Sequence, residues 1–290
     1  VTPEVSKKQI TVVIADKEKF YGETNLALTW SLASGDAYQD NVLVADDTEE
    51  ALVISLSTTA KDNSDVGTYA ITGTSNSANY EVSFTGSGSD GESGILTVKQ
   101  AANSFTTELS CSDYTYAKDE TPEPNAAAKF GTVTYKYATA ALDGTAYKAP
   151  SDESAYTDAI PVNAGIYAVK AYVAETDNYA GLTSDPVVFT INKAAEPTIA
   201  GEERSYAYSA GSGGKTIGVD IAGKLPTDRG TTTYAVAITD TEQLLSEVTV
   251  DTAGNLTYKV NQVDSTKVGK TAIITVTASM ENYANAGYTL

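Results

Sequence analysis

The fold is decided at residues 65–71, where the chain reads Asp65-Val66-Gly67-Thr68-Tyr69-Ala70-Ile71. The pattern returns roughly a hundred residues later as Asn163-Ala164-Gly165-Ile166-Tyr167-Ala168-Val169. A weaker third copy reads Lys267-Val268-Gly269-Lys270-Thr271-Ala272-Ile273, with Thr271 in the place of the tyrosine. Recurrence at this spacing predicts an array of similar structural units.

Two further landmarks support the repeat. In each copy an Asn-Tyr pair follows, and its tyrosine lies 13, 14 and 14 residues after the glycine: Asn79-Tyr80, Asn178-Tyr179 and Asn282-Tyr283. Upstream of each pair, apolar and polar residues alternate in the stretches 26–32 around Trp30, 133–137 and 234–238. Such alternation is typical of a β-strand with one buried face, so we expect one equivalent strand in each unit.

The pattern Asp-x-Gly-x-Tyr is typical of a corner in immunoglobulin-like sandwiches. The glycine permits the turn, and the tyrosine hydroxyl hydrogen-bonds to backbone a few residues upstream. We therefore predict an all-β protein of three tandem immunoglobulin-like β-sandwich domains in an elongated array. The structural corners are expected at Gly67, Tyr69, Gly165 and Tyr167.

The predicted domains are 1–101, 102–195 and 196–290. The last strand of the third domain, opening at Gly287, is expected to be cut short. Ile71 and Val169 stand where antibody domains place a cysteine, so aliphatic packing should replace the disulfide. The linkers 99–103 and 192–197 leave about five residues between strands, which favours a monomeric rod.

A family resemblance rests on four motifs of the first range. These are Phe20-Tyr21-Gly22-Glu23, the corner at 65–69, Asn79-Tyr80 and Gly94-Ile95-Leu96-Thr97-Val98. In this order they make residues 8–101 similar to the mostly-bacterial immunoglobulin-like (MBG-type) repeat domain of bacterial surface proteins. Residues 102–195 resemble bacterial immunoglobulin-like repeats of the same proteins. The resemblance implies an extracellular, cell-surface or secreted location, and it supplies no catalytic residues.

Composition excludes several classes of function. The chain has no His and one Cys, Cys111, so Ser-His-Asp and Cys-His nucleophile systems and Cys/His zinc sites cannot be built. The net charge is −19 and no Lys/Arg cluster occurs, which argues against nucleic acid and anionic lipid as partners. No run of about eighteen apolar residues is present, so no membrane insertion is expected in this segment. We predict a non-enzyme with no catalytic, cofactor-binding or metal site.

Three features of the sequence suggest a binding or catalytic site, but each has a simpler interpretation. The acidic residues Asp46, Asp47, Glu49 and Glu50 lack the spacing of a calcium loop and are interpreted as a solvated loop. The stretch Gly211-Ser212-Gly213-Gly214-Lys215-Thr216 resembles a phosphate loop, but the spacing fails at Ser209, so a β-turn is preferred. Asp152 and Glu153 form a carboxylate pair, yet a small sandwich offers no deep cleft to tune them.

Exposed aromatic residues give the alternative function. Trp30 is interpreted as core, whereas Tyr38, Tyr147 and Tyr156 stand in loop-like surroundings and could form a sugar-stacking platform. The expected function is a non-catalytic stalk, spacer or interaction segment of a larger bacterial surface or secreted protein. The alternative is an adhesin or carbohydrate-binding module. The sequence therefore leaves open whether the chain binds a protein or a glycan ligand.

Overall fold

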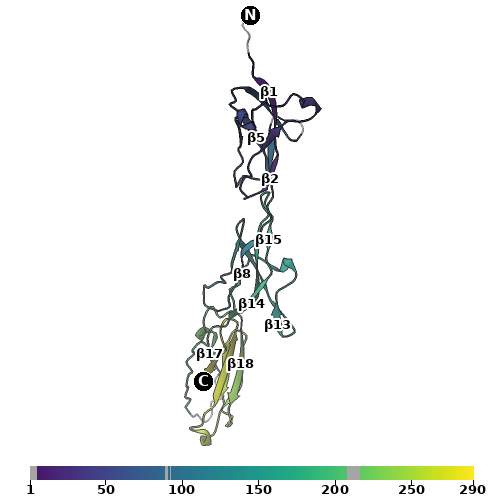
Figure 1. Ribbon diagram of the computed structural model, residues 1–290. Coiled ribbons are helices and arrows are strands. Elements are labelled where there is room, and N and C mark those ends of the chain that lie inside the picture. The colour runs from purple at the N-terminus through teal and green to yellow at the C-terminus, as the bar shows by residue number, and fades with distance from the viewer. Residues whose placement is uncertain (1–4, 89–90, 92, 208–215) are drawn as a thin grey trace. The chain divides into compact units, whose positions relative to one another are not determined.

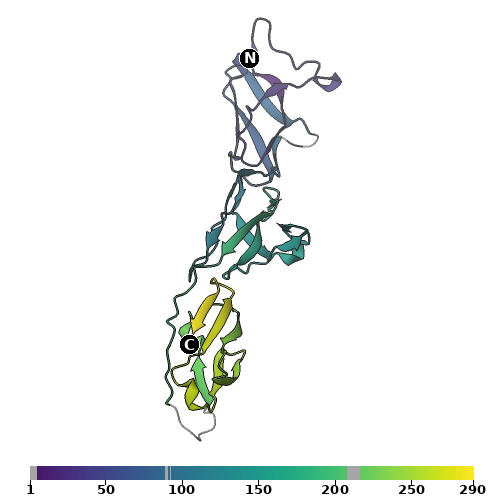
Figure 2. The ribbon, with the colours of Figure 1, turned by 90° about the horizontal axis from the view of Figure 1, so that it is seen from below.

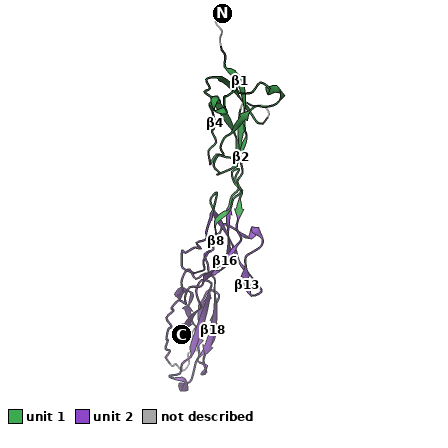
Figure 3. Ribbon diagram, viewed as in Figure 1, with its two compact units in different colours: residues 1–106, 128–132, 173–182 green, residues 107–127, 133–172, 183–290 purple. Residues whose placement is uncertain are grey.

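The computed structural model describes residues 5–88, 91, 93–207 and 216–290. Ser209 and residues 211–215 of the stretch that resembles a phosphate loop lie outside the described residues. The chain divides into two compact units (Figure 3). The first unit contains residues 1–106, 128–132 and 173–182, and the second contains residues 107–127, 133–172 and 183–290.

The prediction of an all-β fold is confirmed. Strands dominate both views of the ribbon (Figure 1; Figure 2). Within the described ranges, helix is limited to short 3-10 turns: η1 (Asp36–Tyr38), η2 (Glu49–Leu52), η3 (Glu153–Ala155), η4 (Ala222–Lys224) and η5 (Ser265–Lys267).

Two sheets make the sandwich of the first unit, with strand orders β3-β1-β6 and β2-β7-β5-β4. Their strands are β1 (Lys8–Ile14), β2 (Lys17–Phe20), β3 (Trp30–Leu32), β4 (Ile54–Thr58), β5 (Gly67–Ser75), β6 (Tyr80–Gly86) and β7 (Gly94–Lys99). Most neighbours are antiparallel, but β1 pairs with β6 and β2 pairs with β7 in parallel. The chain therefore enters this range on one sheet and crosses to the other between β1 and β2.

The core of the first unit lies between these sheets. Ile14 from one sheet packs with Ile71, Leu96 and Val98 from the other, and all are almost fully buried. In β1, the burial of every second residue follows from the alternation of apolar and polar side chains. Ile71 fills the place where antibody domains put a cysteine, as expected from the sequence.

The second unit contains several sheets. Residues up to 192 supply β8 (Phe105–Ser110), β9 (Tyr114–Thr115), β10 (Asn125–Ala128), β11 (Thr134–Thr139), β12 (Ala141–Asp143), β13 (Ala146–Lys148), β14 (Gly165–Val173), β15 (Leu182–Thr183) and β16 (Val187–Asn192). Of these, β8, β10, β14 and β15 each have one or two end residues that are assigned to the first unit. The main sheet has the order β11-β14-β16-β9, with β15 also on β14, and β10-β8 and β12-β13 form small sheets. Val169 is fully buried there beside Tyr137, Phe189 and Ile191.

Residues 216–290 form two sheets of three strands, β17-β20-β19 and β18-β21-β22. The strands are β17 (Thr216–Asp220), β18 (Thr232–Thr239), β19 (Leu245–Val250), β20 (Asn255–Val260), β21 (Ile273–Met280) and β22 (Ala286–Thr289). Val219 and Leu256 from one sheet pack with Ile274, Val276 and Tyr288 from the other. The last strand of this range is β22, which pairs with β21 from Ala286 to Thr289.

The prediction that the strand around Trp30 is equivalent to those at 133–137 and 234–238 is wrong. The strand containing Trp30 is only three residues long and pairs with β1. The strands at 133–137 and 234–238 instead pair with the strand that follows the corner, β14 or β21. In the first unit that position belongs to β4, which pairs with β5. Alternation reports that a strand has one buried face, but it does not report which sheet the strand joins.

Candidate functional site

The two tyrosine corners have the same hydrogen bond. The Tyr69 hydroxyl donates to the Asp65 carbonyl oxygen at 2.8 Å, and the Tyr167 hydroxyl donates to the Asn163 carbonyl oxygen at 3.0 Å. Each bond ties the strand to the turn that opens it. The third copy differs, because Thr271 precedes β21, and Gly269 follows η5 with a φ of 80°.

The corner of the first unit is bound by a distant asparagine. The amide oxygen of Asn178 accepts the backbone N–H of Val66 at 2.8 Å, and its amide nitrogen donates to the Asp65 carboxylate at 2.7 Å. All three residues belong to the first unit. The Asn-Tyr pair of one repeat therefore contacts the corner of the preceding repeat.

The corner of the second unit is bound in the same way. The amide oxygen of Asn282 accepts the N–H of Ala164 at 2.9 Å, and its amide nitrogen donates to the side-chain oxygen of Asn163 at 3.1 Å. The same nitrogen also donates to the Asp228 carbonyl at 2.8 Å. Asn282 is 1% exposed, so this site is more deeply buried than its counterpart at the half-buried Asn178.

Backbone bonds place both asparagines. Ala101 N–H donates to the Asn178 carbonyl at 2.9 Å, and Ala194 N–H donates to the Asn282 carbonyl at 2.8 Å. Both alanines follow the last strand of one repeat and lie opposite the tyrosine of the next Asn-Tyr pair. The linkers are therefore hydrogen-bonded segments rather than free tethers. We call each set of corner, linker alanine and Asn-Tyr pair a junction.

Aromatic rings pack beside the junction of the first unit. The Phe130 ring lies 5.4 Å from that of Tyr21 and is stacked on Tyr179 at 5.7 Å. Gly22 has a φ of 79°, and a Cβ there would lie 2.7 Å from the Phe130 ring. A side chain at position 22 would thus be strained and would collide with Phe130.

Beside the junction of the second unit, the aromatic rings are those of two tyrosines whose hydroxyls share one carboxylate. Tyr116 and Tyr283 meet edge to face with centroids 5.7 Å apart, and both hydroxyls donate to Asp228. Burial, and then the bond to Asp228, raises the pKa of both tyrosines. Burial alone would raise the pKa of Asp228, but hydrogen bonds, including those from the tyrosines, outweigh it and hold that pKa below its ordinary value.

Family comparison identifies the region that carries Tyr21 and Gly22. Residues 10–88 match the MBG domain (YGX type). The pair Tyr21-Gly22 fits the YGX of this description, so the resemblance seen over residues 8–101 is confirmed for this range. The pair packs on Phe130, which lies outside the matched range and beside the junction. The chain matches no functionally curated protein.

Solved structures with weak similarity are multidomain proteins. The Sidekick-1 immunoglobulin domains 1–5 align with 98% of this chain and 58% of theirs at 9% identity and a TM-score of 0.26. The human desmocollin-1 ectodomain aligns with 98% of this chain and 60% of its own at 11% identity and a TM-score of 0.24. The titin I9–I11 tandem aligns with 99% of this chain and 97% of its own at 11% identity and a TM-score of 0.19. The chain thus spans less than two thirds of the first two, and likeness at this level carries no conclusion about fold, binding or assembly.

Sequence reasoning singled out both halves of each junction but missed that they meet. The corner and the Asn-Tyr pair were interpreted as landmarks inside one domain. The recurring asparagine was the available signal, because a buried tyrosine explains the second position of the pair and leaves the first unexplained. Only the contact between residues more than a hundred positions apart reveals its partner.

The acidic loop at residues 46–50, after η1, does not bring its carboxylates together. Asp47 accepts the Tyr80 hydroxyl at 2.6 Å, and Glu50 accepts the Thr48 hydroxyl at 2.8 Å. In the part of the chain that the structure describes, no three His, Cys, Asp or Glu side chains come together to hold a metal ion. Through Asp47, the loop instead accepts the hydrogen bond of the buried Tyr80 hydroxyl.

The tyrosines proposed as a sugar platform do not all face solvent. The expectation for Tyr156 is wrong, because its side chain is 5% exposed, its hydroxyl donates to Pro150 and the Lys170 ammonium lies over its ring. Tyr38 and Tyr147 are exposed, on η1 and β13. A single platform of all three is therefore excluded.

The remaining candidate groups are engaged in local contacts. Hydrogen bonds from Ser154 lower the pKa of Asp152, and hydrogen bonds from Lys170 and Tyr172 lower that of Glu153, which disfavours either carboxyl as a general acid. Burial raises the pKa of the Cys111 thiol to about 11, with a smaller effect of Asp113, so the thiol is protonated at neutral pH.

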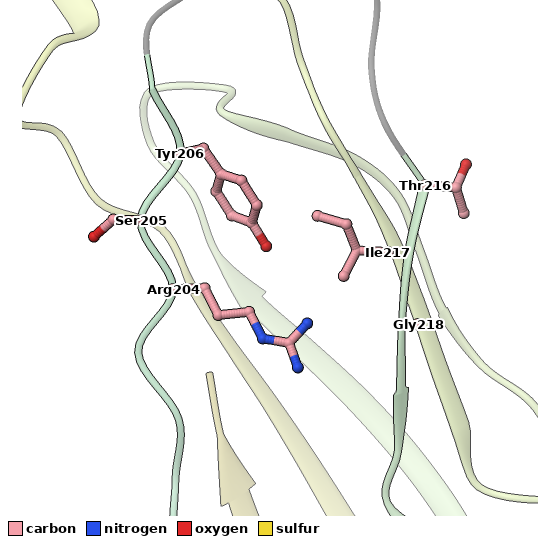
Figure 4. A pocket seen from close by; sticks show the side chains of 6 residues that line it. All are labelled: Arg204, Ser205, Tyr206, Thr216, Ile217 and Gly218. Carbon is pink, nitrogen blue, oxygen red and sulfur yellow. The ribbon is translucent and has the colours of Figure 1, made fainter.

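A shallow hollow lies between Tyr206 and Ile217 (Figure 4). Arg204 lines it but pairs with Glu202 at 2.8 Å, and the Tyr206 hydroxyl hydrogen-bonds to that of Tyr258 at 2.7 Å. Both polar groups are thus already partnered. Among the described residues, no helix is long and apolar enough to span a bilayer.

Proposed function

We propose that the chain is a non-catalytic tandem immunoglobulin-like stalk or spacer segment of a larger bacterial cell-surface or secreted protein. The proposal keeps three repeats, at 1–101, 102–195 and 196–290. The observation that carries it is the recurrence of one junction in both units, formed by an asparagine amide, a corner turn and a linker alanine. A spacer holds its ends apart only if consecutive repeats do not swivel freely, and hydrogen-bonded linkers restrict that motion.

The MBG match over residues 10–88 supports a repeat region outside the cytoplasm. The inert Cys111 and the lowered pKa values of Asp152 and Glu153 support a role without catalysis. The half-buried aromatic cluster of Tyr21, Phe130 and Tyr179 is used for packing rather than for a ligand.

Small-angle scattering of the 290-residue chain tests the spacer. Three sandwiches of roughly 35 Å each, placed end to end, give a radius of gyration of about 30 Å or more. A compact globule of this length has a radius of gyration of about 19 Å. A measured value close to 20 Å would contradict the stalk.

One observation favours the alternative of an adhesin or carbohydrate-binding module. On the β12-β13 hairpin, Leu142 and Tyr147 lie opposite each other and both are exposed. Glycan-array binding by the intact chain that is lost in Tyr147→Ala and kept in Tyr38→Ala would favour this role. Unchanged arrays, together with the extended scattering profile, would favour the spacer.

A further inference from the structure

The first Asn-Tyr pair, Asn79-Tyr80, has the same backbone setting as the two pairs in the junctions. In each case the residue opposite the tyrosine donates its backbone N–H to the asparagine carbonyl. The donors and acceptors are Lys8 and Asn79 at 3.0 Å, Ala101 and Asn178 at 2.9 Å, and Ala194 and Asn282 at 2.8 Å. Lys8 therefore occupies the place of the two linker alanines.

The preceding residue repeats a second contact. Its side chain donates to the backbone carbonyl two positions before the asparagine. The pairs are Lys7 Nζ with Ser77 at 2.7 Å, Gln100 Nε2 with Thr176 at 2.8 Å, and Lys193 Nζ with Met280 at 2.5 Å. Two independent contacts thus place Asn79 as they place Asn178 and Asn282.

The side chain of Asn79 differs from the other two in its exposure and in its partners. It is exposed and makes no side-chain hydrogen bond within residues 5–88, 91, 93–207 and 216–290. In the junctions, the amide oxygen accepts the N–H of the residue before the corner glycine, and the amide nitrogen donates to the side-chain oxygen one residue earlier. A complementary ligand is therefore an Asp-x-Gly or Asn-x-Gly turn.

The chain's third corner lacks the side-chain oxygen that such a site would bind. At Lys267-Val268-Gly269 an ammonium stands where Asp65 and Asn163 place an oxygen, and Lys267 pairs with Glu242 at 2.7 Å. An amide nitrogen cannot donate to an ammonium. Lys7 and Lys8 add positive charge beside Asn79, which favours Asp over Asn at the first position of the ligand.

We propose that Lys7, Lys8 and Asn79 form a docking face for the tyrosine corner of another immunoglobulin-like repeat, one that carries Asp-x-Gly or Asn-x-Gly. The face would form with it a junction like those at Asn178 and Asn282. This inference rests on the proposed function, because it treats the chain as a set of repeats, and it goes further by naming the partner of one face.

A tandem protein tests the docking face. Residues 5–99 are placed ahead of residues 7–290, so that Lys7 takes the position of Gln100 and the linker register is preserved. Asn79→Ala is then made in the second copy and, as a matched control, in the unmodified chain. We expect the variant to lower the melting temperature of that repeat by roughly 4–8 °C in the tandem protein only. Position 267 of the third corner already carries a lysine. Replacing Asp65 of the upstream copy by lysine should make the effect of Asn79→Ala on the melting temperature the same in the tandem protein and in the unmodified chain.

An equal effect of Asn79→Ala in both proteins, or none in either, would overturn the docking face. If the tandem protein does not fold, the recognition rule is tested in the unmodified chain through the Asn178 side-chain amide by NMR. Asp65→Lys should shift its two proton signals and speed their exchange, whereas Asp65→Asn should preserve them. Unchanged signals in Asp65→Lys would also overturn the proposal. Scattering of the unmodified chain does not involve Asn79, so failure of the spacer function would be seen separately.

Discussion

Replacing Asn282 by alanine should destabilise the second unit more than the same change at Asn178 or Asn79 destabilises the first. The Asn282 side chain is 1% exposed and makes three hydrogen bonds, with Ala164, Asn163 and Asp228. A buried hydrogen bond contributes about 1 kcal/mol, so the loss is roughly 2–3 kcal/mol. Asn178 makes two side-chain hydrogen bonds and is half-buried, so its replacement by alanine should lower the stability of the first unit by about 1 kcal/mol. Asn79 is exposed, so its replacement by alanine should lower the free energy of unfolding by less than ~0.5 kcal/mol.

Calorimetry of the intact chain measures this order. In a unit of this size the Asn282 change corresponds to a fall of roughly 5–10 °C in melting temperature. Asn282→Asp sharpens the test, because a carboxylate would face the oxygen atoms of Asn163 and Asp228 without a proton to share. Its folded-state pKa should be raised, so the variant should be stabilised at pH below the ordinary Asp pKa of about 4 and lose that stability as pH rises through the folded value. Equal melting of Asn282→Ala and Asn79→Ala would refute the reasoning.

Three other outcomes are expected. Tyr69→Phe and Tyr167→Phe should each cost about 1 kcal/mol in chemical denaturation, since a corner carbonyl loses its donor, and no shift at either site would contradict the corner assignment. Millimolar Ca²⁺ should leave the melting temperature nearly unchanged, and a rise of about 10 °C would contradict the interpretation of residues 46–50 as a solvated loop. The pKa of Asp228 is lowered in the folded state, so its stabilisation is present above the ordinary Asp pKa of about 4 and is lost as pH falls toward the folded value. Asp228→Asn should therefore flatten the acid limb of stability against pH, and an unchanged limb would count against this role.

Local patterns of sequence determined much of the fold. The alternation in residues 234–238 predicted the strand β18, in which Tyr234 and Val236 are half-buried and Ala235 and Ala237 are exposed, and the corner motifs predicted the turns that open β5 and β14. Period-two burial and turn chemistry depend on neighbouring residues, so they can be predicted from a single sequence.

Contacts set by tertiary packing could not be predicted in this way. Trp30 lies in the sheet opposite to the one its pattern suggested, because both sheets of a sandwich produce the same alternation. Tyr156 stands in a polar stretch yet is buried under Lys170, and the partner of Asn282 is far along the chain. Each depends on which segment folds back over the residue, and local composition does not carry that information.

The parallel pairing of β2 with β7 also determines how the sandwich of the first unit should respond to mechanical load. Tension between Lys8 and Lys99 pulls these strands in opposite directions along their common axis, so the ladder is sheared and its four residue pairs share the force. The equivalent pairing of β9 with β16 has two residue pairs. Under stretching, the region closed by β9 and β16 should therefore yield at a lower force than the sandwich of the first unit, and would lengthen the chain while that sandwich stays folded.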